Sequence, residues 1–99
     1  MSAKKPPFDP DKLYQRALIL HHEGKLKEAE SVYKTLLDFF PNQVEVLTPF
    51  ATLLMQMGRH LEGIKQLKKS LSINPMQPGG LYNLGVELQK QGQLEEALN

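Results

Sequence analysis

Residues 47–63 read LTPFATLLMQMGRHLEG, and residues 81–97, which lie 34 positions further along the chain, read LYNLGVELQKQGQLEEA. Residues 13–29, LYQRALILHHEGKLKEA, have the same arrangement and precede the first stretch by the same step of 34. Each stretch opens on leucine, has glycine at its twelfth position and closes on a small residue. Three copies in one phase predict a repeat protein, because a fixed period of roughly 20 to 50 residues is typical of stacked structural units.

Each unit has the sequence pattern of a pair of helices. Leu47, Ala51 and Leu54 are spaced i, i+4, i+7, which is one face of a helix. Asp9 can cap the first helix and Pro10 fits its first position. The repeated glycines stand where a helix ends with a positive φ. The predicted helices are 10–23, 27–40, 44–57, 61–73, 78–91 and 95–99, and no stretch alternates with the period of a strand.

Pro49 falls inside the third predicted helix, where a proline costs about 3 kcal/mol. One interpretation is that Thr48 caps a shortened helix that begins at Pro49. The other is that the helix begins near Val44 and kinks. The second keeps Leu47 in the register of the repeat, and it is the prediction adopted.

A helix pair that repeats every 34 residues resembles the tetratricopeptide repeat (TPR). The resemblance covers residues 10–99, although Arg16 replaces an apolar residue of the family pattern and Ser70 replaces the usual alanine. It implies an all-α, right-handed solenoid of antiparallel helix pairs with about two and a half repeats. The expected organisation is a mobile lead-in at 1–8, repeats at 10–43 and 44–77, and a truncated third repeat at 78–99. In the third unit the signature positions are Leu81, Leu84, Gly85, Leu88, Gly92 and Ala97.

The third repeat stops about ten residues before its expected closing proline. We therefore expect the chain to be the N-terminal piece of a longer protein. Leu84, Leu88, Leu94 and Leu98 would then expose apolar surface at the C-terminal end, since a solenoid normally ends in a polar cap. The hypothesis that follows is self-association through this end.

In the TPR family, peptide ligands lie in a concave groove lined by the first helix of each unit. The resemblance therefore implies a protein-interaction module that binds a peptide segment of a protein partner. The alternative is that the same positions are ordinary solvated helix surface. The mixed, mostly uncharged groove predicted in this way consists of Tyr14, Gln15, Leu18, His21, His22, Thr48, Thr52, Met55, Gln56, Tyr82, Asn83, Val86, Gln89 and Lys90.

Two sub-classes of the family make different demands on these residues. The co-chaperone clamp for a C-terminal carboxylate needs cationic donors, and none stands at its positions, so that function is excluded. The phrase Asn83-Leu84-Gly85 is similar to repeats of O-linked N-acetylglucosamine transferases. The alternative function is therefore the substrate-recruiting arm of a bacterial glycosyltransferase. The clamp positions hold Tyr14, Leu18, Pro49, Gly79 and Asn83.

The composition argues against several partners. A net charge of +1 gives no electrostatic footprint for nucleic acid or an anionic membrane. No apolar run approaches the roughly 18 residues of a membrane span. The chain has no cysteine, which excludes disulfides and thiolate metal sites and fits a reducing compartment. We expect a cytoplasmic protein.

We expect no catalytic residue, cofactor or metal site in the chain. His21 and His22 are adjacent, so they point to different faces of a helix and cannot chelate a metal together. Glu95 and Glu96 open a predicted helix, where acids favour the dipole. A basic cluster could contact nucleic acid, but we interpret it as a solvated face. This cluster consists of Lys65, Lys68 and Lys69.

Overall fold

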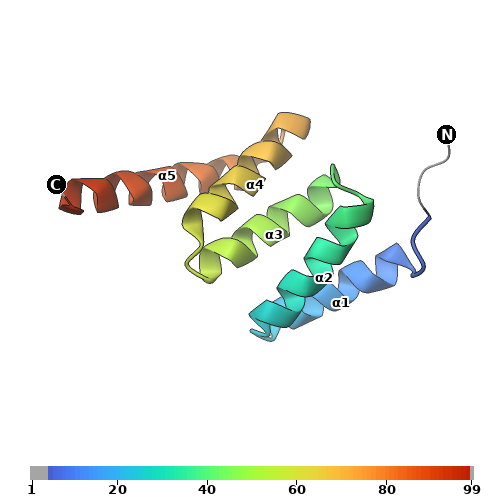
Figure 1. The fold of residues 1–99 in the computed structure, drawn as a ribbon. Coiled ribbons are helices and arrows are strands. Elements are labelled where there is room, and N and C mark those ends of the chain that lie inside the picture. The colour runs from blue at the N-terminus through green and yellow to red at the C-terminus, as the bar shows by residue number, and fades with distance from the viewer. Residues whose placement is uncertain (1–4, 99) are drawn as a thin grey trace.

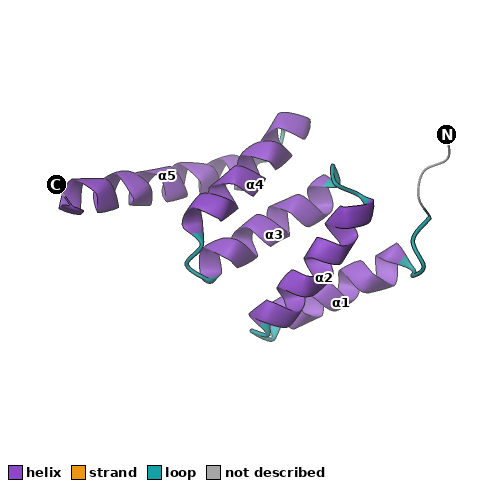
Figure 2. Ribbon diagram, viewed as in Figure 1, coloured by secondary structure: helices purple, strands orange, loops and turns teal. Residues whose placement is uncertain are grey.

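The computed structural model describes the backbone of residues 5–98 and the side chains of residues 5–93. The expectations for residues 1–4 of the lead-in, for the side chains of Leu94 and Leu98, and for Asn99 lie outside this part of the chain. Helices make up nearly all of residues 5–98, which contain no strand (Figure 2). The predicted all-α repeat solenoid is thus confirmed. Its helices are α1 (Pro10–His22), α2 (Leu26–Phe39), α3 (Val44–Gln56), α4 (His60–Ile73) and α5 (Pro78–Leu98).

The helices stack in chain order, so that α1 packs on α2, α2 on α3, α3 on α4 and α4 on α5 (Figure 1). The stack is elongated, with extents of 50 × 30 × 21 Å. The first two turns between paired helices use Gly24 at φ 79° and Gly58 at φ 80°, a conformation that glycine adopts without steric cost. The first two glycines of the repeat therefore end helices as the sequence predicts.

Local signals at the start of the chain act as expected. The Asp9 carboxylate accepts a hydrogen bond of 3.0 Å from the backbone N–H of Asp11 and caps α1, with Pro10 in its first turn. Phe8, at the end of the predicted lead-in, is half-buried and packs edge-to-face on Phe39 with ring centroids 5.1 Å apart. This contact joins the entry of α1 to the end of α2.

Helix α3 runs from Val44 through Pro49 to Gln56. The interpretation with a shortened helix starting at Pro49 is therefore wrong, and the predicted start near Val44 is confirmed. Residues on both sides of the proline belong to the core, since Val46 and Leu47, which precede it, and Phe50, which follows it, are all buried. Burial of these side chains offsets the hydrogen bond that the proline cannot make.

The main difference from the prediction lies at Gly92. The sequence predicts a turn there between helices 78–91 and 95–99, whereas the structure has one continuous helix, α5. A helix that continues through Gly92 keeps its backbone hydrogen bonds, and a glycine within a helix costs only about 1 kcal/mol.

Helices α3 and α4 cross at close range. A Cβ added to Gly63 of α4 would stand 2.9 Å from the backbone oxygen of Ala51 and 2.7 Å from Cγ of Met55, so only glycine fits without a shift. The predicted role of small residues at these two positions is therefore confirmed for this pair. Gly85 of α5 differs, since nothing lies within 4 Å of the Cβ that it lacks.

A matched pair of substitutions tests the continuous helix. Gly92→Ala should raise the free energy of unfolding by about 1 kcal/mol, because alanine favours a helix. Gly58→Ala should lower it by about 1 kcal/mol, because alanine disfavours the positive φ observed there. Urea denaturation of both variants measures the two changes. If Gly92→Ala destabilised the chain as Gly58→Ala does, residue 92 would lie in a turn and the continuous helix would be wrong.

Candidate binding groove

A hollow of about 360 Å³ lies between α3 and α5, and we call it the α3–α5 hollow. Seven of the residues predicted for the groove line it, so residues 30 positions apart in the chain meet as the repeat implies. They are joined by two others, His60 and Glu87, which were not predicted. The complete lining is Thr52, Met55, Gln56, His60, Tyr82, Asn83, Val86, Glu87 and Lys90.

The walls of the hollow are amphipathic. Met55 and Val86 are half-buried and supply apolar contact area from α3 and α5. Tyr82 is 73% exposed and presents an aromatic ring with a hydroxyl group at the rim. Asn83 and Gln56 add amide groups that both donate and accept hydrogen bonds. Such a surface suits a peptide, which offers apolar side chains together with backbone N–H and C=O groups.

The floor of the hollow holds a buried carboxylate. Glu87 is only 7% exposed, and its Oε2 lies 2.9 Å from Nδ1 of His60. The ammonium of Lys90 is 3.6 Å from the other carboxylate oxygen. These contacts give the charge the partners that a buried carboxylate requires.

The sequence itself carries a signal for the burial of Glu87. Glu87 stands 34 positions after Leu53, which is fully buried in α3. An acid at a position where the preceding repeat has a core leucine must find a cation or hydrogen-bond donors. Lys90 lies one turn further along α5, and His60 lies on the neighbouring helix α4. These two side chains are the partners of the Glu87 carboxylate.

Tyr14 lies in a second hollow, of about 460 Å³, between α1 and the start of α3. Asp11, Glu45 and Val46 line the same hollow. Burial, with a smaller contribution from the negative charge of Glu45, raises the pKa of Tyr14 above its usual value. Its hydroxyl is therefore neutral at physiological pH and available as a hydrogen-bond donor.

The remaining predicted residues do not join either hollow. Gln15 lines a separate open depression with Arg16 and Ile19 on α1. Leu18, His22 and Gln89 are exposed on the helices outside the two hollows. The predicted set is thus divided into two hollows and several solvated positions.

Thr48 is engaged in a hydrogen-bond network within the protein. Its hydroxyl donates to Oε1 of Gln77 at 3.0 Å and lies 2.7 Å from the hydroxyl of Ser70. The amide nitrogen of Gln77 donates to the backbone oxygens of Asn74, at 2.7 Å, and of Ser70, at 3.2 Å. Ser70, which replaces the usual alanine, is fully buried. The network ties α3 and α4 to the segment that leads into α5, and so it positions one wall of the α3–α5 hollow.

His21 links three helices. Its Nε2 lies 2.6 Å from Oε1 of Gln56 and its Nδ1 lies 2.9 Å from the hydroxyl of Tyr33. With Nε2–H donating to Gln56, Nδ1 accepts the hydroxyl proton of Tyr33. Tyr33 is fully buried, which raises its pKa to about 12. The chain of contacts orients the side chain of Gln56 at the edge of the α3–α5 hollow.

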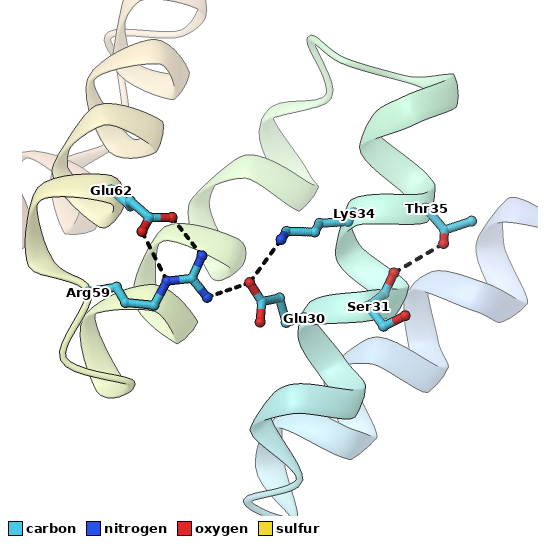
Figure 3. Close-up of polar contacts among 6 residues, drawn as sticks. All are labelled: Glu30, Ser31, Lys34, Thr35, Arg59 and Glu62. Carbon is cyan, nitrogen blue, oxygen red and sulfur yellow. Dashed lines mark hydrogen bonds and ion pairs between the residues drawn. The ribbon is translucent and has the colours of Figure 1, made fainter.

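An ion-pair network joins the first two repeats (Figure 3). Arg59, in the turn before α4, donates from Nη2 to Glu62 at 2.6 Å and from Nε to Glu62 at 3.1 Å. Its Nη1 binds Glu30 of α2, which also pairs with Lys34 at 3.1 Å. The hydrogen bond from Arg59 lowers the pKa of the Glu30 carboxyl, and the same guanidinium lowers that of Glu62.

No group of three or more histidine, aspartate or glutamate side chains in residues 5–93 is arranged to hold a metal ion. No helix within residues 5–98 combines the length and the apolar character that crossing a bilayer requires.

Stacked antiparallel helix pairs with a 34-residue period define a helical repeat protein. The sequence profile of the tetratricopeptide repeat matches residues 13–43 and 45–75, and the chain belongs to this family. It is thus a protein-interaction module of the TPR class.

Several proteins are similar in sequence. The photosystem I assembly protein Ycf3 of Prochlorococcus marinus (strain NATL2A) is 33% identical over 86 residues, which are 84% of this chain and 50% of Ycf3. The BBSome complex member BBS4 of Bos taurus is 28% identical over 76 residues, which are 77% of this chain and 15% of BBS4. The chain spans about half the length of the Ycf3 proteins that it matches.

The fold resembles that of the type III secretion chaperone SycD of Yersinia enterocolitica, solved in complex with a peptide of the translocator YopD. The TM-score is 0.78 with 20% sequence identity, over 88% of this chain and 66% of SycD. A second structure, of SycD as the translocator chaperone, gives the same TM-score with 19% identity over 89% of this chain and 66% of SycD. These likenesses support the solenoid fold alone.

The network at Arg59 makes stability depend on pH. The pKa of Glu30 is lower in the folded chain than its usual value, so the stabilisation is present above pH 4.5 and is lost as the pH falls through the lowered pKa. Glu30→Gln should therefore lower the melting temperature at neutral pH and cost progressively less below pH 4.5. Circular dichroism melts between pH 7 and about 3 measure the difference. A difference that stayed constant over this range would contradict the ion-pair account, and Glu23→Gln, a substitution in an exposed pair with Lys25, is the matched control.

Proposed function

We propose that the chain binds an extended or helical peptide segment of a protein partner, with the α3–α5 hollow as the principal anchoring site. The observation that carries the proposal is the convergence of Met55, Tyr82 and Val86 with amide groups around one hollow. Apolar walls fix a side chain of the partner, while the amides hydrogen-bond to its backbone.

The exposure of Tyr82 supports an interaction role for this site. A tyrosine that is 73% exposed provides a large and rigid contact surface, and tyrosine is enriched at protein interfaces. The hollow between α1 and α3, which contains Tyr14, lies one helix pair away and offers a second position for a longer segment. The named relatives, an assembly protein and a member of a complex, have roles of the kind that this proposal describes.

The alternative function, a glycosyltransferase arm, stays a prediction from the phrase Asn83-Leu84-Gly85. Asn83 is the single asparagine in the lining of the α3–α5 hollow, whereas an arm of that kind grips its substrate with a ladder of asparagines. The peptide-binding proposal uses the whole lining and is the one adopted, with the cytoplasm as the expected compartment.

A peptide selection tests the proposal. The intact chain is used to select clones from a phage-displayed library of random peptides, and synthetic copies of the enriched peptides are titrated by fluorescence anisotropy. Tyr82→Ala should weaken binding by about 30-fold, because truncating an aromatic anchor costs about 2 kcal/mol. Val86→Asp should abolish binding, because it places an unpaired charge on an apolar wall.

The matched control is Met76→Ala, which truncates a side chain that is 84% exposed and lies outside the hollow. The affinity of the Met76→Ala variant for the enriched peptides should equal that of the original chain. Enriched peptides whose affinity is unaffected by Tyr82→Ala and Val86→Asp would show that binding occurs elsewhere and would overturn the proposal.

A further inference from the structure

The hollow between α1 and the start of α3 has apolar walls, and we call it the α1–α3 hollow. Leu36 and Val46 are buried in these walls, and Tyr14 and Phe40 are half-buried beside them. The volume of about 460 Å³ lies in the range of roughly 300–1,000 Å³ that is typical of ligand sites. The hollow can therefore enclose the apolar part of a side chain from a partner. Its complete lining is Pro10, Asp11, Tyr14, Leu36, Phe40, Gln43, Glu45 and Val46.

The charged groups in this lining are all acidic. Asp11 on α1 and Glu45 on α3 are exposed, and the lining contains no lysine, arginine or histidine. Within residues 5–93, neither carboxylate forms an ion pair. Each acid lies in the first turn of a helix, where it favours the helix dipole, but the dipole does not require the two acids to line the same hollow. The rim thus has negative charge without a cation to pair with it.

The next repeat has no such opening at the corresponding place. There the side chain of Gln77 occupies the space, and its amide nitrogen donates to the backbone oxygens of Ser70 and Asn74. The residues 34 positions before Ser70 and Asn74 are Leu36 and Phe40, which line the open hollow instead. The α1–α3 hollow is thus particular to the first repeat. It is bounded by α1, α2 and α3, whereas a further repeat would pack beside α5 and would not cover it.

We infer that the α1–α3 hollow binds an arginine side chain of a protein partner. The aliphatic stem of the arginine packs on Leu36 and Val46, as the stems of long cationic side chains do on apolar surfaces. Its guanidinium donates to the carboxylates of Asp11 and Glu45 and lies against the ring of Tyr14. Arginine suits this lining better than lysine, because a planar guanidinium stacks on aromatic rings and is less strongly hydrated than an ammonium.

Tyr14 and Glu45 act on the same part of the hollow. Burial, with a smaller contribution from the negative charge of Glu45, raises the pKa of Tyr14, so the carboxylate and the ring are close enough to interact. A cation attracted by Glu45 therefore also approaches the ring of Tyr14, and the two attractions reinforce each other. The same negative charge repels an acidic segment, so the hollow discriminates between basic and acidic partners.

The inference rests on the proposed function in one respect, which is that the arginine belongs to a segment of a protein partner. No residue lines both the α1–α3 hollow and the α3–α5 hollow. The two hollows can therefore be examined with separate probes, and a probe for the first needs no contact with the second.

An NMR titration of the intact 99-residue chain with acetyl-arginine methylamide tests the inference. The backbone amide signals of Tyr14, Glu45 and Val46 should shift and saturate, with a Kd of about 10 mM or lower. Acetyl-citrulline methylamide, which has the shape of the first probe without its charge, should bind about tenfold more weakly. Equal affinities for the two probes, or shifts confined to residues outside the hollow, would overturn the inference.

A charge-neutral variant tests the role of the two acids. The double variant Asp11→Asn, Glu45→Gln preserves the side-chain shapes and should bind acetyl-arginine methylamide about tenfold more weakly than the original chain. Glu28→Gln is the matched control, because Glu28 is also an exposed acid in the first turn of a helix and lies outside the hollow. This control should retain the original affinity, and circular dichroism verifies that both variants are folded. An affinity that the double variant leaves unchanged would contradict the role assigned to the acids.

Two further outcomes separate this inference from its alternatives. If acetyl-norleucine methylamide bound as tightly as the arginine probe, the hollow would take an apolar side chain and the inference would be wrong. If the arginine probe failed to bind while selected peptides still depended on Tyr82, the inference would be overturned and the proposed peptide binding at the α3–α5 hollow would stand.

Discussion

The close crossing of α3 and α4 is the constraint on which the rest of the molecule depends. Gly63 has no Cβ, and an added one would stand 2.9 Å from the backbone oxygen of Ala51. A Cβ added to Gly63 would also stand 2.7 Å from Cγ of Met55, a side chain that lines the α3–α5 hollow. One small residue therefore fixes both the spacing of the helix pair and the position of an apolar wall of the candidate site.

Polar side chains hold the successive helices in register around this crossing. In the first network, His21 contacts both Tyr33 and Gln56. In the second, the Thr48 hydroxyl contacts both Ser70 and Gln77. In the third, Arg59 pairs with both Glu30 and Glu62. A neutral intramolecular hydrogen bond contributes only about 1 kcal/mol net, but an unsatisfied buried group costs more. The networks therefore specify one arrangement of the helices more than they add stability. Gln56 lines the hollow, and its side chain is held by His21 of α1. The position of α1 therefore influences the orientation of a side chain in the candidate site.

The period of 34 residues predicted the first four helices and the first two glycine turns, because these depend on local chemistry repeated along the chain. Gly92 stands at the same position of the repeat but lies within the continuous helix α5, so the local signal alone does not decide between a turn and a helix. The groove was partly predictable for the same reason. Thr52 and Val86 could be placed from the repeat, but the engagement of Thr48 and the burial of Glu87 depend on contacts between segments that periodicity alone does not specify.

The stability of Gly63→Ala tests the central claim, that the α3–α4 crossing sets the geometry of the stack and of the hollow. Helix propensity alone predicts that this substitution raises the free energy of unfolding by about 1 kcal/mol. The crossing predicts the opposite, because the new methyl group overlaps backbone at Ala51 and displaces Met55. Urea denaturation should show a loss of about 1–3 kcal/mol. A gain in stability would mean that the two helices are not held at this distance, and the account of the site built on it would be wrong.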